Sequence, residues 1–304
     1  MKILILGRTG QLGWALERRA APLGEIVSLG RAELDLGDPA AVASAVAVHR
    51  PDAVLNAAAY TAVDRAEQER DAAFAVNATA PEALAAACAR HGALLVHYST
   101  DYVFDGRKPE PYVETDPTGP INVYGASKRA GELAIEASGA AAIVLRTSWV
   151  YGDHGGNFAK TMLRLATERD ALRVVADQRG TPTHAGRLAD ATCRILERAR
   201  ASGDAAGWLG ERRGIYHASA AGATTWADYA RLVIATAGES PGFARRLRVR
   251  AEAIEPIPAS AYPTPAARPA NSLLDCSRLA RTFDVALPDW RGDVVDFVRR
   301  VVVA

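Results

Sequence analysis

KILILGRTGQLG, residues 2–13, decides the fold of this 304-residue chain. Its apolar first half predicts a buried strand, the residues after it predict a helix, and three glycines fill the turn between them. Gly7 permits the tight turn, Gly10 lets the backbone approach a diphosphate, and Gly13 allows the helix to pack closely on the sheet. A glycine pattern alone is weak evidence, since it is also compatible with a purely structural turn, but the strand–turn–helix context predicts a nucleotide-binding loop.

Strands and helices continue to alternate along the chain beyond this loop. Strands are expected over 2–6, 26–29, 53–57, 94–99 and 142–146, and helices over 11–21, 41–49, 65–76, 81–91 and 124–138. Asp38 is expected to cap the second of these helices. Such alternation requires crossover connections, so it predicts an α/β fold with a Rossmann-type, doubly wound parallel sheet.

The alternation of strands and helices becomes less regular after about residue 150. Helices are expected over 157–169, 186–200, 225–237 and 290–302, with strands near 172–176 and 214–218. Five prolines within 255–272 predict a loop there. We therefore expect a dinucleotide-binding domain over 1–150 and a smaller, irregular α/β substrate domain over 151–304. Segments near 180–237 are expected to return to the first domain.

Composition excludes several classes of protein. The chain has 36 basic and 35 acidic side chains, a formal net charge of +1 and 49% hydrophobic residues, so a basic nucleic-acid surface and a disordered chain are both disfavoured. Only four of the basic residues are lysines. No uninterrupted apolar stretch of about 18 residues predicts a membrane span. Cys88, Cys193 and Cys276 are too far apart for a zinc motif and are expected to be buried. No metal site is expected, and the chain is expected to be cytoplasmic.

The end of the second strand bears on the cofactor. An acidic residue there would bind the ribose 2′-hydroxyl of NAD, but the sequence has Gly30 and Arg31. Together with Arg8, Arg31 offers two guanidinium groups that suit a 2′-phosphate, which favours NADPH while leaving NADH possible. The alternative is that both arginines are simply solvated. Asp35 and Leu36 follow closely and are expected near the adenine.

Two side chains one helical turn apart predict proton transfer. Tyr124 and Lys128 share a face at the start of a predicted helix, and the ammonium is expected to lower the pKa of the phenol. A third group is expected where the fourth strand ends, because ligands bind at the carboxyl edge of such sheets. Thr100 is favoured over Ser99 for this hydroxyl, and Asp101 is either a site residue or a loop cap.

Several longer motifs identify a family. The chain resembles the extended short-chain dehydrogenase/reductase superfamily and, within it, the family of dTDP-4-dehydrorhamnose reductases. The resemblance covers nearly the whole chain. It is carried by GRTGQLGW (7–14), LNAAAYTAVDRAE (55–67), HYSTDYVFDG (97–106), NVYGASKRAGE (122–132), RTSWVYG (146–152), NFAKTMLRLA (157–166), TTWADYA (224–230), AYPTPAARPANSLLD (261–275) and LPDW (287–290).

The resemblance implies roles for individual residues. Tyr124 would be the proton donor, Lys128 its partner, and Thr100 the hydroxyl that polarises the sugar carbonyl. Thr100, Asp101 and Trp149 would touch the sugar; an indole offers an apolar wall, although Trp149 alone is equally a core aromatic. The residues expected along the cofactor are Gly10, Gln11, Leu12, Asp35, Leu36, Ala59, Tyr60, Thr61, Tyr98 and Lys128. Gly30 is a departure, because some members of the family carry an acid there.

The implied reaction is NADPH-dependent reduction of the C4 keto group of dTDP-6-deoxy-L-lyxo-4-hexulose to dTDP-L-rhamnose, by a monomer or weak homodimer. One alternative is a sugar-nucleotide epimerase or dehydratase of the same superfamily. A dehydratase typically has an Asp-Glu pair after the strand-end threonine, whereas here Asp101 and Tyr102 follow it. Another is a non-catalytic subunit resembling the regulatory subunit of methionine adenosyltransferase.

Overall fold

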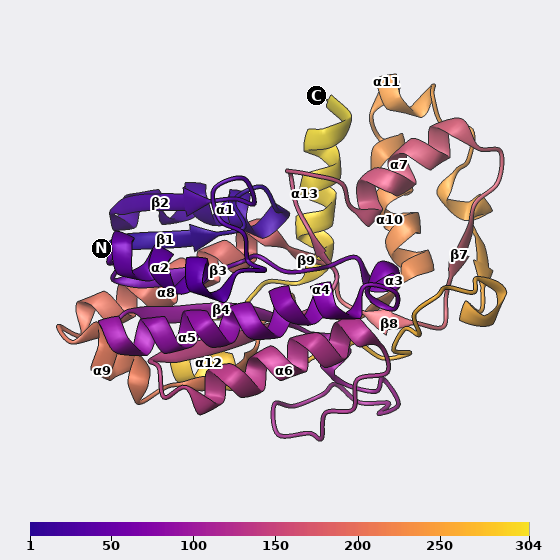
Figure 1. Cartoon of the computed structure of the whole chain (residues 1–304). Helices are drawn as coiled ribbons and strands as arrows, with labels where there is room; N and C mark the ends of the chain where they lie inside the picture. The colour runs from indigo at the N-terminus through magenta and orange to yellow at the C-terminus, as the bar shows by residue number, and fades with distance from the viewer. Residues whose placement is uncertain (304) are drawn as a thin grey trace.

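The computed structural model describes residues 1–303, and a parallel six-stranded sheet forms its centre (Figure 1). The strand order is β10-β5-β4-β3-β1-β2, with β1 in the interior and crossovers on both sides of it. Each neighbouring pair is parallel, which confirms the predicted doubly wound, Rossmann-type fold. The strands are β1 (Lys2–Leu6), β2 (Glu25–Leu29), β3 (Ala53–Asn56), β4 (Leu94–Thr100), β5 (Ala142–Thr147) and β10 (Gly214–His217).

Helices cover both faces of this sheet. Successive side chains of β1 point to opposite faces, so Ile3 and Ile5 enter one core while Leu4 and Leu6 enter another. Figure 1 shows α5 and α6 in front of the sheet and α8 and α9 behind it. Asp38 caps α2 as expected, accepting two backbone N–H groups. The covering helices are α1 (Gln11–Ala20), α2 (Pro39–His49), α5 (Ala80–His91), α6 (Val123–Ala137), α8 (Ala185–Ala201) and α9 (Ala205–Gly210).

One helical segment differs from the expectation of two helices at 65–76 and 81–91. The chain forms α3 (Val63–Ala66) and then a continuous helical run of α4 (Arg70–Phe74), a π-helical turn η2 (Ala75–Thr79) and α5. Pro81 has no N–H to offer the preceding turn, and the wider π turn accommodates it. The carbonyl of Asn77 instead lies against α6, where a Cβ on Gly131 would be 2.1 Å from its oxygen.

The same run, Arg70–His91, is long and apolar enough to cross a membrane by length and composition, with a hydropathy of 1.2. Its α5 part packs between α2 and α6 on the sheet. A helix that is buried against a sheet and its neighbouring helices is expected to be this apolar.

A second core lies beside the sheet, at the upper right of Figure 1. It is built from α7 (Phe158–Glu168), α10 (Trp226–Gly238) and α13 (Trp290–Val303). Among the segments near 180–237 that were expected to return to the first domain, β10 joins the central sheet and α8 packs on it. Helix α10, in contrast, belongs to this second core. The division into domains at residue 150 remains a prediction.

Short elements connect and flank these cores. The expected loop over 255–272 begins with a short strand, β12, which pairs with β7. The remaining elements are η1 (Ala21–Leu23), η3 (Asp101–Val103), β6 (Val150–Tyr151), β7 (Arg173–Val175), β8 (Arg179–Gly180), β9 (Thr183–His184), β11 (Thr224–Thr225), α11 (Pro241–Ala244), η4 (Ala251–Ala253), β12 (Glu255–Ile257), η5 (Ala259–Ala261) and α12 (Ser277–Phe283).

The cysteines are free thiols, and two of them are buried as expected. Burial raises the pKa of the Cys88 and Cys193 thiols to about 12, so both stay protonated and unreactive at neutral pH. The expectation was wrong for Cys276, which is only partly buried because it lies where α12 begins, with its sulfur 3.4 Å from the Ser219 hydroxyl.

Candidate active site

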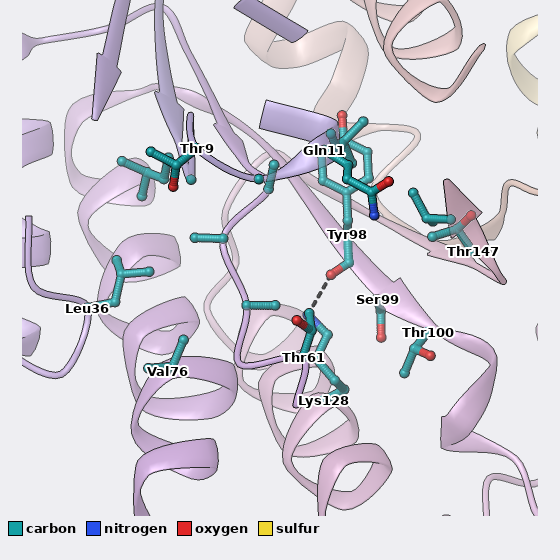
Figure 2. A pocket seen from close by; sticks show the side chains of 18 of the residues that line it. Thr9, Gln11, Leu36, Thr61, Val76, Tyr98, Ser99, Thr100, Lys128 and Thr147 are labelled. Atoms are coloured by element: carbon teal, nitrogen blue, oxygen red, sulfur yellow. Dashed lines mark hydrogen bonds between the residues drawn. The ribbon is translucent and has the colours of Figure 1, made fainter. Parts of the chain in front are cut away.

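A cavity of about 450 Å³ opens where the sheet's strands end. It extends from the ends of β1 and β2, past the segments that follow β3, to the ends of β4 and β5, which is the edge where doubly wound sheets bind ligands. Figure 2 shows Leu36 and Val76 on one side of it and Thr100 and Thr147 on the other. Most of the predicted site residues line it: Gly7, Gly10, Gln11, Leu12, Arg31, Asp35, Leu36, Ala59, Thr61, Tyr98, Thr100, Asp101, Tyr124, Lys128 and Trp149.

The glycine loop has the geometry that its sequence predicts. Gly7 has a φ of +87°, and a Cβ there would lie 2.7 Å from the backbone nitrogen of Ala58. A Cβ on Gly13 would lie 2.1 Å from the carbonyl oxygen of Gly7, so Gly13 serves the packing of α1 on the loop and does not line the cavity. Gly10 precedes α1 without any side-chain cap, which leaves the first N–H groups of the helix available to an anion.

Tyr60 departs from the prediction that it lies along the cofactor. It does not line the cavity, because its hydroxyl donates a hydrogen bond to the carboxylate of Glu69 on the partly exposed side. Its backbone N–H donates instead to the side-chain oxygen of Asn77, 2.8 Å away. Asn77 also donates to the hydroxyl of Ser127 at 3.0 Å, and so ties the cavity wall at 57–61 to α6. The sequence signal that was missed is an asparagine in the mostly apolar run before Pro81.

An acidic residue does lie at the end of β2, contrary to the sequence interpretation. The chain turns back after Gly30, so the Glu33 carboxylate accepts the Gly30 N–H at 2.8 Å. The same carboxylate forms an ion pair with Arg8. Arg8 is therefore not a free guanidinium and does not line the cavity, whereas Arg31 does. Both partners of the pair are more than a third exposed, so the pair is weak and can rearrange.

Tyr124 and Lys128 enter the cavity from the first turns of α6. Asn122 caps this helix by accepting the Gly125 N–H at 2.7 Å. Gly125 is needed because a Cβ there would lie 2.1 Å from the carbonyl oxygen of Tyr102, so the helix begins pressed against the turn after β4. The buried ammonium of Lys128 donates to the carbonyl oxygen of Tyr98 at 2.6 Å, drawn as the dashed line in Figure 2.

The pKa of Tyr124 shifts in the direction opposite to the expectation. Burial raises the pKa of the phenol to about 12, and the hydroxyl of Thr100 offsets only part of this effect. The Lys128 ammonium donates instead to the carbonyl oxygen of Tyr98 on β4. Burial also lowers the pKa of Lys128 to about 8. Tyr124 is therefore protonated at neutral pH, which suits a proton donor better than a base.

Two further groups of the cavity lie beside Tyr124. The Thr100 hydroxyl donates to the Asp101 carboxylate at 3.2 Å. Burial raises the pKa of Asp101 to about 7, and its Oδ2 finds no hydrogen-bond partner within residues 1–303. A carboxyl oxygen that is buried without a partner costs free energy, so it is available to a polar ligand group.

Trp149 forms an aromatic wall of the cavity. Its backbone has a φ of +46°, an uncommon value for a bulky residue. The ring stacks on Trp226, with centroids 3.6 Å apart and planes 13° from parallel. A Cβ on Gly180 would lie 2.3 Å from the indole, so that glycine makes room for it. The strained backbone is thus held by packing, in a position where Trp149 lines the cavity.

Two ion pairs around the site were not predicted. Glu132 and Arg146 are almost fully buried and form two hydrogen bonds of 2.7 and 2.8 Å. Near the other end of α6, Arg268 binds Asp64 through two bonds of 2.7 and 2.8 Å and so fastens the loop of residues 262–272 to α3. Neither pair could be predicted from the sequence, because the partners are distant in the chain and any of its 32 arginines could have been involved.

Known proteins resemble this chain over its full length. The family described as RmlD substrate binding domain matches residues 1–303. The dTDP-4-dehydrorhamnose reductase of Burkholderia thailandensis is 50% identical over 291 residues, which cover 96% of each chain. A solved dTDP-4-dehydrorhamnose reductase from Clostridium acetobutylicum has a TM-score of 0.86 at 33% identity and covers 99% of each chain. The enzyme of that name from Bacillus anthracis, solved in complex with NADP, has a TM-score of 0.84 at 34% identity and covers 98% of this chain and 99% of its own.

Proposed function

The chain belongs to the RmlD substrate-binding domain family, and from this premise we propose that it reduces the C4 keto group of dTDP-6-deoxy-L-lyxo-4-hexulose to give dTDP-L-rhamnose. The observation that carries the proposal is the meeting of Tyr124, Lys128 and Thr100 in one cavity beside a glycine loop. Tyr124 is protonated there and Asp101 offers an unpartnered oxygen for a sugar hydroxyl. The curated relatives carry the name of this activity.

NADPH is the proposed cofactor. The residues fit a dinucleotide: Gly7 and Gly10 leave no side chain between the loop and a diphosphate, and the free N–H groups of α1 face it. Arg31 lines the cavity at the end of β2, and its guanidinium would bind a 2′-phosphate. Lys128 would donate to the ribose next to the nicotinamide. The solved relative from Bacillus anthracis is in complex with NADP, which supports the choice.

The protein's part in the reaction is to stabilise and neutralise the negative charge that develops on the oxygen of the C4 keto group. When bound, the reduced nicotinamide supplies the hydride that reaches C4. Tyr124 donates its proton to the oxygen on which negative charge grows. Thr100 donates a hydrogen bond to the same oxygen, for which its hydroxyl proton turns away from the Asp101 carboxylate. Both donors are held by the end of β4 and the start of α6 before substrate arrives, so they act most strongly on the transition state. Trp149 would pack against the C6 methyl group.

Reduction is distinguished from the alternatives by its stoichiometry. Purified protein mixed with NADPH and the dTDP-4-keto-6-deoxysugar should consume both in equal amounts, seen as loss of the near-ultraviolet absorbance of NADPH. An epimerase or dehydratase would change the sugar without net loss of NADPH. A non-catalytic subunit would change neither. Either of those two outcomes contradicts the proposal.

Glu33→Gln tests the cofactor preference. The glutamine keeps an oxygen for the Gly30 N–H but removes the charge that holds Arg8, so the guanidinium is free to join Arg31 at a 2′-phosphate. We expect the ratio of kcat/KM for NADPH to that for NADH to rise roughly tenfold, the size of one charge-assisted hydrogen bond. Glu25→Gln, at the opposite end of β2, is the matched control. An unchanged ratio in Glu33→Gln would show that Arg8 plays no part in the preference.

The pH dependence of dinucleotide affinity tests the role of Lys128. Because burial lowers the pKa of this lysine to about 8, its ammonium is present below that pH and is lost above it. The affinity for NADPH should therefore be constant on the acidic side and fall as the pH rises through about 8. Lys128→Arg keeps its charge at every accessible pH, so its weaker binding should show no such inflection. The same inflection in the arginine variant would assign the titration to another group.

A further inference from the structure

The donors of Lys128 are almost all used inside the protein. The side chain is 2% exposed, and an ammonium carries three N–H donors and no acceptor. One donor binds the Tyr98 carbonyl oxygen at 2.6 Å. A second faces Nε2 of His97 at 3.3 Å. The lysine lines the cavity, so the remaining N–H is the one available to a ligand.

His97 is a neutral imidazole in the middle of β4. It is fully buried, and burial together with the charge of Lys128 keeps its pKa well below the ordinary value. A neutral imidazole has one N–H and one lone pair. Because Nε2 faces a group that can only donate, Nε2 must carry the lone pair and Nδ1 the proton.

Asn56 is the group that meets this proton. The structure places its Nδ2 3.0 Å from Nδ1 of His97 and leaves its Oδ1 without a hydrogen-bond partner within residues 1–303. A half-turn of the carboxamide exchanges these two atoms, so that Oδ1 accepts the ring proton of Nδ1. Asn56 therefore fixes the tautomer in which Nε2 is free to accept from Lys128.

The two residues owe their meeting to strand pairing. Asn56 and His97 lie opposite each other in the register of β3 and β4, and both are buried. They are the polar exceptions in the otherwise apolar runs AVLN and LLVH. A histidine among leucines and valines costs free energy unless its nitrogens are bonded. Here both hydrogen bonds run in one direction, because Lys128 donates to Nε2 of His97 and Nδ1 of His97 donates to Asn56.

We propose that His97, with its tautomer fixed by Asn56, is a positioning residue that holds the Lys128 ammonium so that its third N–H points to the ribose of the dinucleotide. This inference rests on the proposed function, because it assumes a dinucleotide in the cavity. The alternative is that His97 only fills and stabilises the sheet. The two differ in what they predict for dinucleotide affinity.

The test compares three variants by their dissociation constants for NADP⁺, measured by calorimetry without any sugar. His97→Leu removes the acceptor and should weaken binding about 10- to 100-fold, as expected for a lost hydrogen bond to a charged group. His97→Gln has an amide oxygen that reaches the place of Nε2 and should recover most of this affinity. His97→Asn is too short to reach the lysine and should bind as weakly as His97→Leu.

His217→Leu is the matched control. His217 is also fully buried in the sheet, on β10, but its Nδ1 lies 3.0 Å from the carbonyl oxygen of Tyr112 and it has no contact with Lys128. It should lower the midpoint of thermal unfolding while leaving the dissociation constant unchanged. If His97→Leu does not fold, the comparison of His97→Gln with His97→Asn decides.

Two results would overturn the inference: wild-type affinity in His97→Leu, or equal affinities in His97→Gln and His97→Asn. In the reductase assay, folded His97→Leu should also have a raised KM for NADPH with little change in the KM for the sugar. A wild-type protein that binds NADP⁺ but reduces no sugar would contradict the proposed function alone, because the binding comparison would still stand.

Discussion

Tyr124→Phe is expected to lose about 10²- to 10⁴-fold in kcat, the usual contribution of a positioned general acid. The substitution removes one oxygen from a partly buried ring and leaves its packing, including the edge-to-face contact with Tyr102, in place. The affinity for NADPH should stay nearly unchanged, because Lys128 is held by β4 and not by the phenol. Steady-state kinetics for turnover and fluorescence titration for binding would measure the two quantities separately.

Tyr102→Phe is the matched control for that variant. The centroids of the Tyr102 and Tyr124 rings are 5.6 Å apart, and like Tyr124, Tyr102 is a partly buried phenol whose pKa is raised by burial. It does not line the cavity, so its loss should leave most of the turnover. Wild-type turnover in Tyr124→Phe, or an equal loss in both variants, would remove Tyr124 from the role of proton donor.

Glu132→Leu is expected to lower the free energy of unfolding by about 3–5 kcal/mol, because it leaves a buried arginine without its partner. Glu132 and Arg146 are 0% and 1% exposed, and the two hydrogen bonds between them join α6 to β5. Chemical denaturation followed by circular dichroism would measure the loss. Glu132 is one turn from Lys128 on the same helix, so activity should be assayed only on the folded fraction.

Two further variants test whether the lost stability comes from the buried ion pair. Glu136→Gln, one turn further along α6, removes only an exposed contact 3.5 Å from Arg129 and should change the free energy of unfolding by less than about 0.5 kcal/mol. The double variant Glu132→Leu/Arg146→Met removes both buried charges and should recover much of the stability. A single variant as stable as wild type would mean that the buried pair contributes nothing.

The central sheet could be predicted from the sequence because its signals are local. Apolar runs bounded by turns predicted the strands, and the glycine loop predicted a nucleotide-binding site at the edge of the sheet where the cavity lies. The helix after Asn122 brought Tyr124 and Lys128 to the same face, as their spacing required. The end of the fourth strand predicted Thr100, and the family motifs added roles for Asp101 and Trp149; the structure brings all three to that cavity.

Side chains whose partners lie far along the chain could not be predicted. The role of Glu33 depends on the fold, because only the turn after β2 brings its carboxylate to Gly30 and Arg8. The pKa of Tyr124 is raised where a lowered value was expected, because the spacing of the two residues shows that a lysine is near but not how far the fold buries the phenol. Asn56 and His97 lie within the predicted strands 53–57 and 94–99, but the sequence does not show that they meet. Only the register of β3 and β4 places them opposite each other.

The most direct test of the proposed chemistry follows the hydride itself. Wild-type protein is mixed with NADPH deuterated at the transferable position of the nicotinamide and with the dTDP-4-keto-6-deoxysugar, and the product is examined by nuclear magnetic resonance. The account predicts dTDP-L-rhamnose with one deuterium bound to C4 and an equal amount of oxidised cofactor. A sugar that is recovered as the ketone, or altered without deuterium at C4, would contradict it.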